Sequence, residues 1–92
     1  MKHLALGSQL TLTQTPSLLE SLTKQLEAPA TTLDLSGVNE IDSSAVSLLL
    51  ACQRRAHERD IALHFQHLPP ALRSLMDLYS VTALIPDTTA GH

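Results

Sequence analysis

Three adjacent polar residues, Asp42, Ser43 and Ser44, stand directly before a long apolar segment that contains no glycine or proline. A serine hydroxyl can act as a nucleophile or accept a phosphate group, and a neighbouring carboxylate can orient it. Aspartate and serine are also the residues favoured at the start of a helix, where they accept hydrogen bonds from unpaired N–H groups. Four interpretations of this corner are therefore open: a plain helix cap, a nucleophile, a phosphate acceptor or a docking site.

The remainder of the chain offers little that would complete a catalytic centre. It has no GxSxG turn, and the segment GVNEIDS at 37–43 lacks the GxxxxGK[ST] phosphate-loop pattern. His57, His64 and His67 could suggest a metal, but in an extended strand His64 and His67 would point to opposite faces. The single cysteine, Cys52, lies on an apolar helix face and is expected to fill the core. We expect no catalytic residue, no metal site and no cofactor.

Length and composition indicate one small folded domain. The chain has 92 residues, of which 43% are hydrophobic, and a net charge of −3. We expect a single domain over residues 1–86 and a loose tail over residues 87–92. With no stripe of Lys and Arg, and only Phe65 and Tyr79 as aromatic residues, nucleic-acid binding is disfavoured. No apolar run is long enough for a membrane span, and no signal peptide is evident, so we expect a cytoplasmic protein.

Hydrophobic periodicity predicts strands alternating with helices. The expected elements are strands at 3–6 and 9–13 joined by a hairpin turn at Gly7-Ser8, a helix capped by Thr15, a strand at 31–36, a helix at 43–58, a strand at 61–66, a helix opened by Pro69-Pro70, and a short strand at 81–85. Most strands alternate apolar and polar residues, whereas a strand covered on both faces is apolar throughout. The expected fold is therefore α/β, a small mixed sheet with helices packed on one face.

The strand pattern also predicts which side chains are buried. The apolar set expected under the helices is Leu10, Leu12, Leu33, Leu35, Leu63 and Phe65. Thr11, Asp34 and His64 are expected on the more open face, because successive side chains of a strand point in opposite directions.

The helix predicted at 43–58 has two unlike faces. At 100° per residue, one arc holds Ala45, Leu48, Leu49, Cys52 and Ala56, which we expect to face the sheet. The opposite arc holds Ser43, Ser47, Leu50 and Arg54, here called the Ser43 ridge. Leu50 makes this outer face partly apolar, as a docking surface would be. The alternative is a solvated face with one incidental leucine. At the helix start, unpaired N–H groups could accommodate a phosphate on Ser43.

Two segments resemble a known family. The stretch LDLSGVNEIDSSAVSLLLACQRRA, at 33–56, resembles the signature of STAS domains, which occur in bacterial anti-sigma factor antagonists and at the ends of sulfate transporters. The stretch HLPPALRSLMDLYSVTALIP, at 67–86, resembles MlaB-type STAS proteins, which are cytoplasmic subunits of the Mla phospholipid-transport ABC complex. The family fold, a small mixed sheet with helices on one face, agrees with the pattern of the strands.

The resemblance implies a role for the serine corner. In MlaB-like subunits the position of Ser43 is a hydroxyl residue that contacts the ATPase subunit. This implies a non-enzymatic subunit at the inner face of the inner membrane. The family's use of the Ser43 position and the shared helical arc together predict a partner-binding site of Asp42, Ser43, Ser44, Ser47, Leu50 and Arg54. In anti-sigma factor antagonists a partner kinase phosphorylates the same position, so the alternative is an antagonist switched at Ser43. The sequence departs from the antagonists at Ala45-Val46, where they commonly have Gly-Leu.

Overall fold

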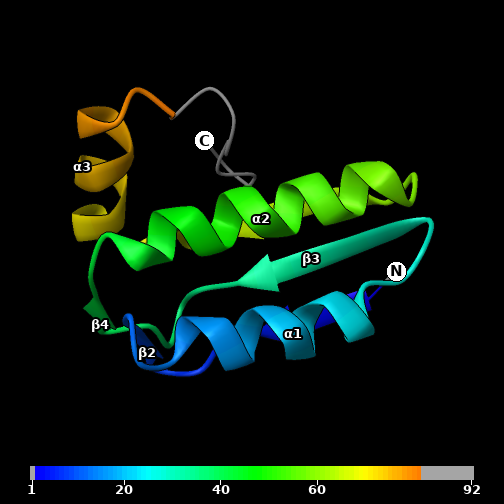
Figure 1. Ribbon diagram of the computed structural model, residues 1–92, viewed down its shortest axis with the longest axis horizontal. Helices are drawn as coiled ribbons and strands as arrows, with labels where there is room; N and C mark the ends of the chain where they lie inside the picture. The colour runs from blue at the N-terminus through cyan, green and yellow to red at the C-terminus, as the bar shows by residue number, and fades with distance from the viewer. Residues whose placement is uncertain (1, 82–92) are drawn as a thin grey trace.

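The computed structural model describes residues 2–81 (Figure 1). Its elements in chain order are β1 Lys2–Ala5, β2 Gln9–Leu10, α1 Thr15–Gln25, β3 Ala30–Asp34, β4 Glu40–Ile41, α2 Ser44–Glu58, β5 Ala62–Gln66 and α3 Pro70–Leu78. Residues 82–85 of the strand expected near the end of the chain, and the expected tail at 87–92, lie outside the described residues.

The α/β fold class is confirmed, with one difference in the sheet. In place of one mixed sheet, the described residues form a three-stranded sheet in the order β1-β3-β5 and a two-stranded sheet of β2 and β4. Every pairing in both sheets is parallel. The expected hairpin at Gly7-Ser8 is therefore wrong. Gly7 does turn the chain, with a φ of 80°, but it directs β2 into the second sheet rather than back along β1.

The helices and the three-stranded sheet enclose the main core. Leu4, Leu33 and Phe65 lie in register across β1, β3 and β5, and all three are buried. Figure 1 shows α1 and α2 side by side across one face of β3, with α3 at one end. The opposite face of the sheet carries the polar row of His3, Thr32 and His64.

The segment after β2 departs from the expected strand at 9–13. The carbonyl of Thr11 accepts hydrogen bonds from the N–H groups of Gln14 and Thr15, both at 2.9 Å, so the chain turns here. Leu12 lies on this turn and is 71% exposed, which contradicts its expected burial. Thr15 is the first residue of α1 rather than its cap, and Gln14 holds the cap position.

The side of α2 that was predicted to face the core is confirmed. Ala45, Leu48, Leu49, Cys52 and Ala56 are all buried. Burial raises the pKa of the Cys52 thiol to about 11, so it stays protonated at neutral pH and fills space as expected. Within residues 2–81, no helix combines the length and the apolar character that crossing a bilayer requires.

Candidate functional site

Asp42 organises the corner at the start of α2. Its Oδ1 atom accepts hydrogen bonds from the Ser44 backbone N–H, at 2.8 Å, and from the Ser44 hydroxyl. Its Oδ2 atom accepts a hydrogen bond from the Leu12 backbone N–H, also at 2.8 Å. The Asp42 carboxylate therefore joins the first turn of α2 to the turn that precedes α1.

Ser43 is left out of this network. It occupies the cap position of α2, with φ of −63° and ψ of −18°, and makes no side-chain cap hydrogen bond. Its backbone conformation is already helical, whereas a capping residue is typically extended. The capping role therefore belongs to Asp42, and the exposed Ser43 hydroxyl has no hydrogen-bond partner within residues 2–81.

The N–H groups at the start of α2 are already engaged. The Ser44 N–H donates to the Asp42 side chain, the Ala45 N–H to the Asp42 carbonyl at 3.0 Å, and the Val46 N–H to the Ser43 carbonyl at 3.2 Å. The expected accommodation of a phosphate by unpaired donors is therefore not supported. A phosphate on Ser43 would instead stand beside the Asp42 carboxylate, and the two like charges would repel each other.

A shallow groove runs along the outer face of α2. Its volume is about 240 Å³. The described residues that line it are Ser43, Val46, Ser47, Leu50, Tyr79 and Val81. Val46 is buried and Leu50 is half-buried, so they form an apolar base, while the exposed Ser43 and Ser47 carry hydroxyls along it. Tyr79, just after α3, adds an aromatic ring. The groove can take an apolar side chain of a partner at its base, and its hydroxyls can bond to polar groups of the partner beside that side chain.

The structure brings together three of the four residues of the Ser43 ridge. Ser43, Ser47 and Leu50 line the groove, while Arg54 is exposed on the next turn of α2 and does not line it. Asp42 and Ser44 lie at the corner and bond to each other.

The model of the family described as "Mlab, STAS domain" matches residues 2–86. The chain belongs to the MlaB-type STAS domains. Among curated proteins, no sequence match is found. The resemblance of residues 33–56 and 67–86 to this family is thereby confirmed.

Two solved structures share the fold of this STAS domain. A sulfate transporter family protein from Wolinella succinogenes superposes with a TM-score of 0.73 at 13% identity, covering 92% of this chain and 70% of that one. The anti-sigma factor antagonist SpoIIAA in its unphosphorylated form superposes with a TM-score of 0.74 at 14% identity, covering 97% and 82% of the two chains. At these identities the likeness establishes the fold alone.

Sequence patterns missed two apolar side chains of the STAS domain near Ser43. Tyr79 continues the helical spacing of Leu72, Leu75 and Met76, yet it lies just after α3 and is 50% exposed. Leu12 was expected in a buried strand but lies beside Asp42. Helical spacing alone could not predict the exposure of Tyr79, because α3 ends one residue earlier, at Leu78.

Another polar cluster lies on the open face of the sheet. Asp34 Oδ1 accepts a hydrogen bond from the Ser36 N–H at 2.9 Å and lies 3.1 Å from Nδ1 of His67, and Asp34 Oδ2 lies 3.9 Å from Nε2 of His3. The Ser36 N–H is the main cause of the lowered pKa of Asp34. Within residues 2–81, no set of three or more His, Cys, Asp or Glu side chains is placed to hold a metal.

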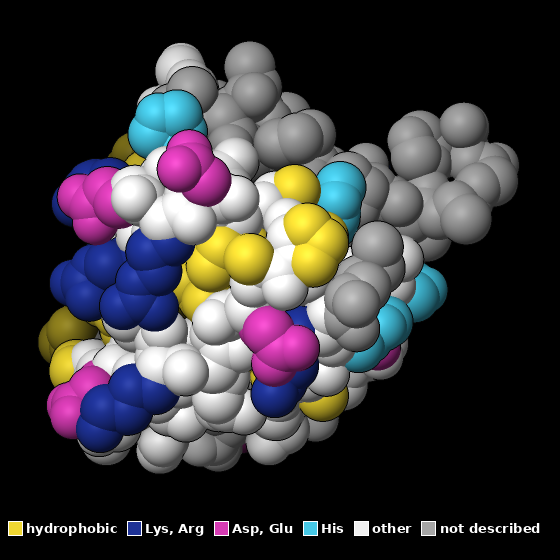
Figure 2. Space-filling view, turned by 90° about the vertical axis from the view of Figure 1, so that its right-hand side faces the viewer, with side chains coloured by type: hydrophobic (Ala, Val, Ile, Leu, Met, Phe, Trp, Pro, Cys, Tyr) yellow, Lys and Arg dark blue, Asp and Glu magenta, His cyan; other side chains and the backbone are white. Residues whose placement is uncertain are grey.

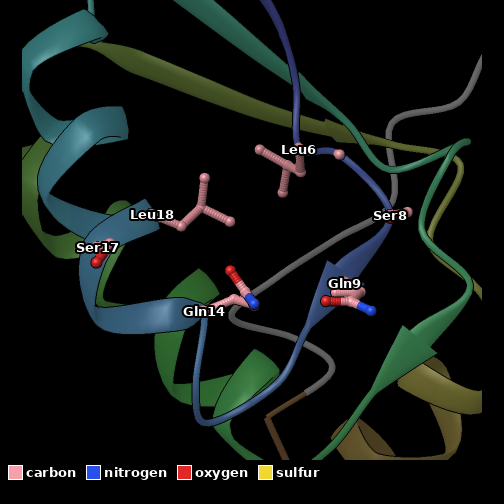
Figure 3. A pocket seen from close by; sticks show the side chains of 7 residues that line it. Leu6, Ser8, Gln9, Gln14, Ser17 and Leu18 are labelled. Carbon is pink, nitrogen blue, oxygen red and sulfur yellow. The ribbon is translucent and has the colours of Figure 1, made fainter.

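A second pocket, of about 360 Å³, lies between the start of α1 and the segment from Leu6 to Gln9. Figure 3 shows Leu6 and Leu18 turned toward each other across it, with the amides of Gln9 and Gln14 nearby. No charged or titratable side chain is among its described lining residues, so it offers no acid, base or nucleophile with a raised reactivity.

Replacing Asp42 by Asn is expected to lower the melting temperature of the STAS domain near neutral pH. Hydrogen bonds from Ser44 and Leu12 lower the pKa of Asp42 below its ordinary value of 3.8. Their contribution is therefore full at pH values above 3.8 and is lost as the pH falls through the lower pKa of the folded state. Thermal unfolding of both proteins from about pH 7 down to about pH 2 should show a difference that shrinks below 3.8. A constant difference would contradict the role of the charge.

Proposed function

We propose that this STAS domain is a non-catalytic binding subunit. It docks through the Ser43 ridge on the ATPase of an Mla-type phospholipid-transport ABC complex and supports its assembly or activity, in the cytoplasm at the inner membrane. The observation that carries the proposal is the Ser43 hydroxyl, which has no hydrogen-bond partner within residues 2–81 and stands beside a groove with an apolar base. The MlaB-type family of the chain supports the choice of partner.

The geometry of the corner disfavours a nucleophilic role for Ser43. An activated serine needs a base within hydrogen-bond reach of its hydroxyl. Asp42 is the adjacent candidate, but its carboxylate is engaged by Leu12 and Ser44, and hydrogen bonds from those residues lower its pKa, which makes it a weaker base. Ser43 is therefore better suited to contact a partner than to attack a substrate.

A second candidate function is that of an anti-sigma factor antagonist. The fold likeness to unphosphorylated SpoIIAA favours it, as does an exposed serine after the motif aspartate. In this candidate the partner is an anti-sigma factor kinase, and phosphorylation of Ser43 would place a dianion beside Asp42 and disrupt binding by charge repulsion.

Two substitutions at Ser43 separate these functions. If the hydroxyl bonds to the ATPase, Ser43→Ala should weaken binding by about 0.5–1.5 kcal/mol, the usual net value of a neutral hydrogen bond. Ser43→Asp should weaken it further, since a larger and charged group enters the contact. Ser43→Ala should not lower the unfolding midpoint, because the hydroxyl makes no hydrogen bond within the described residues. Isothermal titration calorimetry against the purified ATPase subunit measures the affinity of both variants.

Ser74→Asp is the matched control for charge, because Ser74 is an exposed serine on α3 that is not among the residues lining the groove. It should bind like the wild type. In the same titration against an anti-sigma factor kinase, a loss with Ser43→Asp but none with Ser43→Ala would favour the antagonist with its phosphorylation switch. Wild-type affinity for both Ser43 variants would remove Ser43 from the contact altogether.

A further inference from the structure

The carboxylate of Asp34 connects three segments of the three-stranded sheet. Asp34 is the last residue of β3, and its Oδ1 atom lies 3.1 Å from Nδ1 of His67, the residue that follows β5. Its Oδ2 atom lies 3.9 Å from Nε2 of His3 in β1. One carboxylate of the central strand therefore stands between imidazoles that come from both of its neighbours in the sheet.

The backbone of His67 has a conformation that its side-chain contact helps to hold. Its φ is 59°, in the left-handed region, which costs energy for residues other than glycine and persists only where the surrounding structure holds it. The contact of the ring with Asp34 is one such restraint. The next residue, Leu68, is buried, and α3 begins two residues after it. The Asp34–His67 pair thus lies where the chain leaves the sheet for α3.

No other basic group of the described residues contacts this carboxylate. Within residues 2–81, only the rings of His67 and His3 come within ion-pair distance of Asp34. The other charged or titratable residues of β1, β5 and α3 make no ion pair with Asp34; they are Lys2, His64, Arg73 and Asp77. Figure 2 shows His side chains on its right-hand side, apart from most of the Lys and Arg side chains. The charge of Asp34 is therefore left for the two imidazoles to balance.

Protonation changes how strongly an imidazole binds a carboxylate. A neutral imidazole can donate from one ring nitrogen only, whereas a protonated imidazole has two N–H groups and a positive charge. A histidine side chain ordinarily takes up this charge between about pH 8 and pH 5. Hydrogen bonds from the Ser36 N–H and from His67 lower the pKa of Asp34 below its ordinary value of 3.8, so the carboxylate stays ionised over this whole range.

We propose that Asp34, His67 and His3 form a pH-sensitive clasp, which binds the three strands together more tightly as the pH falls from about 8 to about 5. The clasp acts within the chain itself and is independent of the proposed partner. Its stabilisation requires charged imidazoles, so it is fully present on the acid side of the histidine titration and is lost as the pH rises through it. At the acid limit it is lost again below pH 3.8, where Asp34 takes up a proton.

The test is the melting temperature of the full chain at about pH 5 and at about pH 8, the two limits of the histidine titration. His67→Asn removes the imidazole but keeps a residue type that tolerates the left-handed backbone. It should lower the melting temperature by roughly 2–6 °C more at the acid limit than at the alkaline one. His3→Gln should act in the same direction with a smaller effect, because its contact with Asp34 is longer.

His64→Gln is the matched control. His64 lies on the same face of the sheet, in register with Thr32, but makes no hydrogen bond or ion pair within residues 2–81. Its replacement should produce no added loss at the acid limit. An added loss equal to that of His67→Asn would overturn the clasp, because removal of any histidine from this face would then have the same effect.

A double-mutant cycle tests whether the imidazole acts through the carboxylate. Asp34→Asn removes the charge but keeps a side-chain oxygen that can accept the hydrogen bond from the Ser36 N–H. In the Asp34→Asn background, His67→Asn should lose its pH-dependent effect. An effect of His67→Asn that persists without the Asp34 charge would overturn the clasp. An effect that is equal at both pH values in the wild-type background would overturn it too, since the contact would then be an uncharged hydrogen bond.

Discussion

Leu35→Ala is expected to lower the free energy of unfolding by about 2–5 kcal/mol, the usual cost of emptying a buried leucine site. Leu35 follows β3, is fully buried in the main core, and is held by a 2.9 Å hydrogen bond from its N–H to the Gln66 carbonyl. Because small domains are stable by only about 5–15 kcal/mol, the loss should be a large share of the total. Urea unfolding followed by circular dichroism measures it.

Leu12→Ala is the matched control for this loss. The same atoms are removed from a side chain that is 71% exposed, so the free energy of unfolding should change by no more than about 0.5 kcal/mol. Equal effects of the two substitutions, or an unchanged midpoint for Leu35→Ala, would mean that the core is placed wrongly.

Elements with a long hydrophobic period could be predicted from the sequence. The helix expected at 43–58 is observed as Ser44–Glu58, and its core arc from Ala45 to Ala56 is buried as expected. The strand expected at 31–36 is observed as Ala30–Asp34, with Leu33 buried. In both elements the periodic apolar residues face one core, so the local pattern and the packing agree.

The short segments could not be predicted, because distant residues determine them. β2 and β4 are two residues each and exist through their mutual pairing, about thirty residues apart in the chain. Leu12 continues the alternation of β2, yet its N–H bonds to Asp42 rather than to a strand. The alternating pattern alone extends the strand to residue 13, whereas this distant contact ends it at Leu10.

The sequence pattern indicated a candidate site at the start of α2, but it did not show which residue of this site caps the helix and which is left without a partner. Asp42 and Ser43 are equally good helix caps, so their types do not decide which one caps α2. The backbone decides it, because Ser43 already has helical angles and Asp42 reaches the Ser44 N–H. The contribution of Tyr79 depends on how the end of α3 lies against α2, which no local pattern encodes.

Leu50→Asp is expected to weaken binding to the ATPase subunit on the order of a hundredfold. Leu50 is half-buried at the base of the groove, midway along the Ser43 ridge. In the complex its side chain would be desolvated by the partner, and a carboxylate there would be buried without a counter-charge. A central apolar residue of an interface typically has the largest effect when it is replaced by a charge.

Two controls isolate the contact from folding. Leu50 also packs against the main core, so Leu50→Asp must retain a cooperative unfolding transition and the wild-type circular dichroism spectrum. Ala62→Asp adds the same charge at an exposed position of β5, beyond the far end of α2, and should bind like the wild type. Equal losses with both aspartates would point to a general charge effect rather than to the groove.

The most direct test of docking through the Ser43 ridge is a calorimetric titration of the purified ATPase subunit with the wild-type chain and with Leu50→Asp. We expect a saturable binding isotherm for the wild type and no measurable heat of binding for the folded Leu50→Asp variant at the same concentrations. Identical isotherms for the two proteins would contradict the docking surface on α2, and the absence of binding by the wild type would contradict the ATPase as its partner.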